Sequence, residues 1–132
     1  MGRTVYEVGV IAHFEAAHRL VGNFGPATRM HGHTYRVEVS LRGERLADDG
    51  TLVDIAALQQ AVGEVTQGLH VNCLDDVAAL AGANTTAEVV ATHIANEVAT
   101  RLDGADVHRA DVIAVRVWES PSAFAAHERP LR

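Results

Sequence analysis

The sequence contains no lysine and only one cysteine, Cys73. Its 11 basic residues are all arginine and the net charge is −6, so the chain is a poor candidate for binding a phosphate backbone and no nucleic-acid partner is expected. A lone cysteine cannot form an internal disulfide, and a reducing cytoplasm is the expected location. No apolar run approaches the roughly 20 residues that a membrane helix needs, so no membrane partner is expected. What is present is a 48% hydrophobic chain, long enough for a single domain over residues 1–132.

Alternating apolar and polar side chains predict the strands. Residues 4–18 form the first such stretch, and a second strand is expected to begin near His33 and to end at Gly43. The last strand is expected at about 111–119, with 51–53 as a further candidate strand. Together these stretches predict a four-stranded antiparallel sheet.

Apolar residues at helical spacing predict two helices between the second and the last strand. The first is expected at about 54–68, with Asp54 as its N-cap. The second is expected to begin at a capping box formed by Thr85 and Glu88, and its inner stripe ends at Leu102. The sequence therefore predicts an α+β fold with both helices on one face of the sheet.

Three of the eight histidines can converge on one point. His31 and His33 are two residues apart on a strand, which places them on one face about 6.6 Å apart. His18 has the matching parity at the end of the first strand, so strand pairing can bring it to the same place. Three imidazoles without a thiolate are typical of a catalytic zinc with an open position. A His-x-His pair can equally be an exposed polar pair, and the spacing leaves both interpretations open.

Five stretches of the chain resemble the signature of one enzyme family. The segment FEAAHRL is followed, 13 residues after its histidine, by HGH. DIAAL, NTTAEV and VWESP follow in order. Together they resemble the 6-pyruvoyltetrahydropterin synthase and 6-carboxytetrahydropterin synthase family, the latter from the queuosine pathway, over nearly the whole chain.

The resemblance implies a fold, a metal and a substrate. The fold would be the tunnelling fold, in which three subunits close an oligomeric β-barrel and two trimers stack, so a homohexamer or a homotrimer is expected. Zn²⁺ would be held by His18, His31 and His33. Glu119 matches the glutamate that anchors the amino and ring NH groups of the pterin, and Thr86 matches a residue that contacts the same ring. The expected partner is therefore a pterin-like small molecule, bound between subunits.

The chain departs from the family pattern at the residues that move protons. The family cysteine, four residues before His-Gly-His, is Ala27 here. Counted from Asp54 without a gap, the family's Asp-His pair falls on His70 and Val71. A shifted register that matches His70 to the family histidine leaves Leu69 in place of the aspartate. General acid–base groups each contribute about 10² to 10⁴ in rate, so the loss of all three predicts a rebuilt active site.

The expected replacements are His70 and Asp75, with Asp76 and Cys73 nearby in the sequence. A neutral His70 can act as a base at pH 7, and it can equally be a loop residue that fills space. Cys73 is expected to be a small buried residue rather than a displaced nucleophile.

Three functions remain open at this point. The first is a zinc-dependent lyase of this family with a rebuilt active site, performing lyase, aldol, isomerase or cyclase chemistry on a pterin-like or other carbonyl- or hydroxyl-bearing substrate. The second is a genuine 6-pyruvoyl- or 6-carboxytetrahydropterin synthase that acts on dihydroneopterin triphosphate. The third is a non-catalytic pterin- or purine-binding relative, against which the complete set of three histidines argues.

Overall fold

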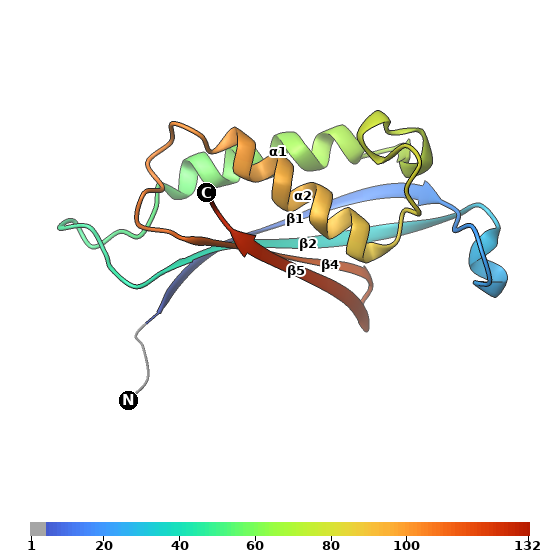
Figure 1. Ribbon diagram of the computed structural model, residues 1–132, viewed down its shortest axis with the longest axis horizontal. Helices are drawn as coiled ribbons and strands as arrows, with labels where there is room; N and C mark the ends of the chain where they lie inside the picture. Colours follow the sequence, from blue (N-terminus) through green and yellow to red (C-terminus); the bar gives the residue numbers. More distant parts are fainter. Residues whose placement is uncertain (1–4) are drawn as a thin grey trace.

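A sheet of long strands carries two helices on one of its faces in the computed structural model, which describes residues 5–132 (Figure 1). The strands are β1 (Tyr6–His18), β2 (His31–Gly43), β3 (Asn72–Cys73), β4 (Val112–Ser120) and β5 (Ala123–Pro130). The helices are α1 (Ile55–Leu69) and α2 (Ala87–Arg101), and the short 3-10 turns are η1 (Gly25–Thr28), η2 (Leu74–Asp76) and η3 (Ala78–Leu80). The predicted α+β class and the placement of both helices on one face are confirmed.

The strand count of the prediction was wrong. The sheet has five strands in the order β3-β1-β2-β4-β5, and the two-residue β3 runs parallel to β1. The candidate strand at 51–53 is irregular chain, although Leu52 and Val53 are buried in the core. The missing partner of β4 is instead β5, an edge strand with mostly exposed side chains and no β-branched residue. Thr4, where the first strand was predicted to begin, lies outside the described residues.

The sheet is open, with β3 and β5 as its edge strands. Closure into a barrel would therefore need strands from further copies of the chain, and the oligomeric barrel stays a prediction. Within residues 5–132, neither helix has the length and apolar character required to span a bilayer.

The helix starts agree with the predictions to within a residue or two. Asp54 caps α1 as predicted, because its side chain accepts a hydrogen bond from the amide of Ala56. The cap of α2 is Thr86, whose hydroxyl accepts from the amide of Val89, so the predicted capping box beginning at Thr85 was wrong by one residue. Ile55 has the spacing of the apolar stripe of α1, but it is 48% exposed.

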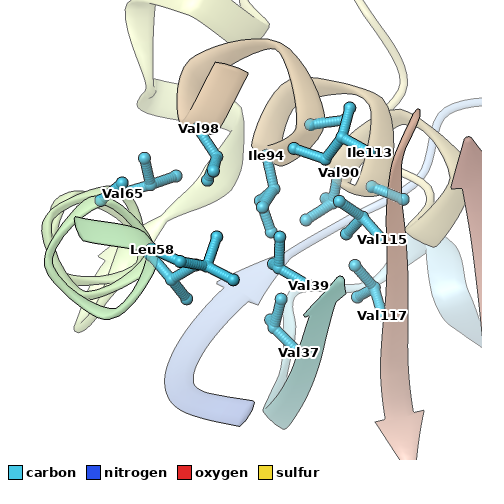
Figure 2. Close-up of a cluster of buried hydrophobic side chains, with 14 of the residues drawn as sticks. Val37, Val39, Leu58, Val65, Val90, Ile94, Val98, Ile113, Val115 and Val117 are labelled. Atoms are coloured by element: carbon cyan, nitrogen blue, oxygen red, sulfur yellow. The ribbon is translucent and has the colours of Figure 1, made fainter. Parts of the chain in front are cut away.

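Aliphatic side chains from both helices and the inner face of the sheet form the core (Figure 2). The residues labelled there are Val37, Val39, Leu58, Val65, Val90, Ile94, Val98, Ile113, Val115 and Val117. Full burial of such a side chain stabilises the fold by about 1.5–3 kcal/mol. This core fixes β1, β2 and β4 against the helices, and it thereby sets the positions of the strand ends where the predicted site lies.

Candidate metal centre

The pairing of β1 and β2 brings the three predicted metal ligands together. The register places His18 opposite His31 and Ala16 opposite His33, so all three imidazoles lie on the helix-covered face. Their ring centroids are 4.6, 4.9 and 5.2 Å apart. One nitrogen from each ring lies within 4.8 Å of the others. Tetrahedral zinc with bonds of about 2.0–2.1 Å needs nitrogens about 3.4 Å apart, so a modest rotation of the rings would complete the site.

Two of the three rings are held in the tautomer that a metal requires. The Nδ1 of His18 lies 2.8 Å from the carbonyl oxygen of Thr85, and the Nδ1 of His31 lies 2.7 Å from that of Arg29. A carbonyl oxygen can only accept, so each Nδ1 carries the proton, and the lone pair of each neutral ring is on Nε2, which in His18 also lies within hydrogen-bond distance of the Tyr35 hydroxyl. Metal-binding histidines characteristically have their second nitrogen anchored in this way. The residues present therefore fit a zinc ion.

The surroundings of His33 favour its neutral imidazole. Burial lowers the pKa of His33, and the neighbouring His18 and His31 act in the same direction, while the carboxylate of Glu119 opposes them. Tyr35 is fully buried, and its hydroxyl lies 3.4 Å from the Nε2 of His18. Burial raises the pKa of Tyr35, and Glu119 adds to the effect, so this hydroxyl stays protonated. Neutral imidazole is the form that binds a metal.

Asp75, one of the two predicted catalytic residues, lies in η2 and contacts Thr85 and Arg19 near the triad. Its Oδ1 accepts from the hydroxyl of Thr85 at 2.8 Å. Its Oδ2 accepts from the amide of Arg19 at 3.0 Å and from the thiol of Cys73 at 3.6 Å. Burial raises the pKa of Asp75, but these hydrogen bonds outweigh it and hold the pKa below its ordinary value. The carboxylate is therefore ionised at neutral pH, with both oxygens engaged.

His70, the other predicted catalytic residue, contacts β1 through its backbone partner Glu15. It follows the last residue of α1, and its Nδ1 accepts a hydrogen bond of 3.1 Å from the amide of Glu15. The proton of the neutral ring is consequently on Nε2. Because the Nδ1 lone pair is engaged, His70 can act as a base there only after it breaks this hydrogen bond.

The two predicted substrate-binding residues lie near the triad in different ways. Glu119 is half-buried, at the point where the register of β4 and β5 shifts between Trp118 and Ser120. Its charge acts on both His33 and Tyr35, which places it beside the triad. Thr86 is next in sequence to Thr85, but its hydroxyl oxygen already accepts from a helix amide.

Two residues of the site were not predicted. Tyr35 is fully buried on the same strand as two of the ligands, and its parity with His31 and His33 is the signal that could have placed it at the site. Thr85 was interpreted as a helix cap, whereas it is fully buried and hydrogen-bonded to His18. No signal in the sequence links residues 67 positions apart.

Space for a ligand adjoins the triad. A hollow of about 610 Å³ runs alongside β3, and its lining includes His33, Thr34, Val71 and Cys73. Cys73 was expected to be buried, but it is only half-buried. Its Sγ lies 4.0 Å from the Sδ of Met30. A larger hollow of about 790 Å³ lies along the helix-free face of the sheet, away from the three histidines.

Val71, which follows His70 at the end of α1, has a strained backbone. Its φ is +57°, a region that a β-branched residue rarely adopts, and its side chain is 76% exposed. Such a conformation costs about 1–3 kcal/mol. We expect Val71→Gly to raise the thermal midpoint by a few degrees, because the relief of strain exceeds the entropy cost of glycine, about 0.5–1 kcal/mol.

Val21→Gly is the matched control for this prediction. Val21 is 75% exposed, and its φ is not positive. The same substitution there has no strain to relieve and should lower the midpoint slightly. A midpoint for Val71→Gly below that of the unaltered protein would show that the conformation of Val71 is not strained.

The sequence and the fold are both similar to those of known tetrahydropterin synthases. The family model described as 6-pyruvoyl tetrahydropterin synthase matches residues 7–130. The 6-carboxy-5,6,7,8-tetrahydropterin synthase of Bacillus subtilis is 30% identical over 128 residues, covering 92% of this chain and 84% of that protein. The Rickettsia felis protein of the same name is 27% identical over 130 residues, covering 84% and 91%. The structure of Caenorhabditis elegans 6-pyruvoyl tetrahydropterin synthase superposes with a TM-score of 0.81 at 24% identity, covering 98% and 99%, and shows the same fold.

Proposed function

We propose that this chain, which belongs to the 6-pyruvoyl tetrahydropterin synthase family, is a zinc-dependent enzyme with a tetrahydropterin-synthase-like function and a rebuilt set of proton-transfer groups. The observation that carries the proposal is the histidine triad, whose ligand atoms lie within 4.8 Å of one another. His18, His31 and His33 would hold the ion. When bound, zinc supplies Lewis acidity, which is worth several kcal/mol of charge stabilisation.

A pterin-like heterocycle is the substrate that the neighbouring groups favour. Glu119 presents a half-buried carboxylate beside His33, and a carboxylate there can accept from the amino and ring NH groups of a planar heterocycle. Pairing with such donors would also compensate for the partial burial of its charge. Thr86 would contact the same ring, and the hollow beside His33 offers room for it. The names of the relatives as tetrahydropterin synthases support this class of substrate.

His70 and Asp75 remain the predicted proton-transfer residues, and the hydrogen bonds distinguish between them. Asp75 accepts from Arg19, Thr85 and Cys73, so few lone pairs are left for a substrate proton. His70 makes one ring contact, to the amide of Glu15. A ring that exchanges this contact for a substrate proton would be a competent base at neutral pH.

Two substitutions of His70 separate chemistry from structure. His70→Ala removes the ring, while His70→Asn keeps an acceptor where Nδ1 meets the amide of Glu15. If His70 transfers a proton, both variants should lose about 10² to 10⁴ in kcat with the substrate in use. If it only supports β1, His70→Asn should retain near-normal turnover. Single-turnover kinetics on both variants gives the answer.

A genuine pterin synthase reaction is supported almost equally, because the curated relatives are named 6-carboxy-5,6,7,8-tetrahydropterin synthase. Purified protein loaded with zinc and supplied with dihydroneopterin triphosphate, with and without acetaldehyde, decides between the two functions. A tetrahydropterin product would establish the synthase reaction. Absence of any pterin product would remove the synthase reaction, and retained binding of the pterin without turnover would favour the non-catalytic pterin- or purine-binding relative over both enzymes.

We further propose, from the family resemblance, that the open sheet assembles with other copies into a homotrimeric or homohexameric barrel in the cytoplasm. Sedimentation at equilibrium measures the number of chains directly. A monomer at micromolar concentration would contradict the barrel.

A further inference from the structure

We infer that Asp75 and Thr85 form a hydrogen-bonded relay that fixes the imidazole of His18 for metal binding, and that both are positioning residues of the metal centre. The inference rests on the proposed function, because it requires that the triad hold a metal. It concerns residues of this chain that were assigned to other roles by their sequence: Thr85 to a helix cap and Asp75 to catalysis.

The contact between Thr85 and the predicted metal ligand His18 is buried. His18 is 1% exposed and Thr85 is 0% exposed. The Nδ1 of His18 lies 2.8 Å from the carbonyl oxygen of Thr85 and 3.3 Å from its hydroxyl oxygen. The single Nδ1–H is thus shared between two acceptors of one residue. Since no water competes at a buried contact, the state of the Thr85 hydroxyl directly affects the tautomer of His18.

Asp75 sets the direction of the Thr85 hydroxyl. The hydroxyl donates its only proton to Oδ1 of Asp75 at 2.8 Å, so its lone pairs are what faces His18. Without an acceptor at Asp75, the hydroxyl could turn and donate to Nδ1 instead. That arrangement would move the ring proton to Nε2, the nitrogen that must be free to bind a metal. The Thr85 carbonyl requires the proton on Nδ1, and the carboxylate reinforces this tautomer by keeping the Thr85 hydroxyl from donating to the same nitrogen.

The second oxygen of Asp75 holds the backbone beside the ligand. Oδ2 accepts from the amide of Arg19, the residue that follows His18, at 3.0 Å. This contact ties η2 to the end of β1. Asp75 thereby restrains both the ring of His18, through Thr85, and the main chain next to His18, through Arg19. This arrangement is expected of a residue that supports a metal-binding side chain rather than one that contacts substrate.

The expected effects follow from what each substitution removes. Partners of metal ligands typically contribute 10- to 100-fold to metal affinity. Thr85→Val removes the hydroxyl but keeps the carbonyl acceptor, so a loss of about tenfold is expected. Asp75→Asn can place an amide donor against Thr85 or Arg19, and a loss of about 10- to 100-fold is expected. Thr85→Ser keeps the hydroxyl and should bind the metal like the unaltered protein.

Zinc affinity, measured on the full chain by competition with a chromophoric chelator, tests the relay. Asp76→Asn is the matched control, because Asp76 is the exposed neighbour and the change in charge is the same. If the two residues act in series, the double variant Asp75→Asn, Thr85→Val should lose less affinity than the product of the single losses. Wild-type affinity in both single variants, or independent losses together with weak binding by Thr85→Ser, would overturn the relay.

A metal-free measurement separates this inference from the proposed function. Nitrogen-15 NMR of histidine-labelled protein reports which ring nitrogen of His18 carries the proton, and the relay requires Nδ1 in the unaltered chain. Detection of the Nε2–H tautomer there would overturn the relay whether or not the variants fold. Absence of zinc binding by a protein with the Nδ1–H tautomer would instead contradict the proposed function.

Discussion

Replacing His33 by alanine is expected to lower the affinity for zinc by more than about 100-fold, beyond the range typical of residues that only support a ligand. His33 is half-buried and lies in a triangle of rings whose centroids are about 5 Å apart. Its removal leaves two imidazoles, which are too few for the three-ligand site of a catalytic zinc. Turnover should disappear with the metal, while the fold persists because the core lies elsewhere along the strands. Competition with a chelator measures the affinity, and circular dichroism reports the fold.

His13→Ala is the control for this substitution. His13 lies on the same strand as His18, but it is exposed and its parity places it on the opposite face. Its removal should leave zinc affinity unchanged. Equal losses in the two variants would mean that histidines bind zinc nonspecifically, and wild-type affinity in His33→Ala would remove His33 from the site.

Phe14→Ala is expected to destabilise the fold by about 3–5 kcal/mol, the largest stability effect that we predict. Phe14 is 1% exposed and stacks on Tyr35, with ring centroids 4.7 Å apart and an interplanar angle of 12°. Alanine would leave a cavity next to the tyrosine whose hydroxyl lies 3.4 Å from Nε2 of His18. Packing of the core and geometry of the triad are therefore linked through this aromatic pair.

Urea unfolding in the presence of a chelator measures this effect without a contribution from bound metal. Phe24→Ala is the matched control, because Phe24 is 45% exposed and precedes η1. Its substitution should change the free energy of unfolding by no more than about 0.5 kcal/mol. A similar small change for Phe14→Ala would show that the Phe14–Tyr35 pair does not support the core.

Periodicity accounts for the parts of the fold that could be predicted. β1 and β2 alternate over their length, and the stripe of α2 that includes Val90, Ile94 and Val98 is buried as expected. β5 could not be predicted, because its alanines and polar residues carry no alternating pattern and pair with β4 through the backbone. The short β3 could not be predicted either, because a strand of two residues is too short to show an alternating pattern.

In the candidate site, the three histidines could be predicted from the sequence, whereas the residues around them could not. Parity along two strands predicted that His18, His31 and His33 would meet, and the register of β1 and β2 brings them together. The environment of the triad depends instead on the loop that carries Asp75 and Thr85, which reaches the end of the sheet beside the β1–β2 connection (Figure 1). Contacts between segments so distant in the sequence follow from the packing of the whole chain, which local patterns do not encode.

The most direct test of the central claim is an anomalous difference map, collected at the zinc edge, from crystals of the zinc-loaded protein. The account predicts one strong peak per chain, about 2.0–2.1 Å from an imidazole nitrogen of each of His18, His31 and His33. A map with no peak between these three rings, or with zinc bound only elsewhere, would contradict it.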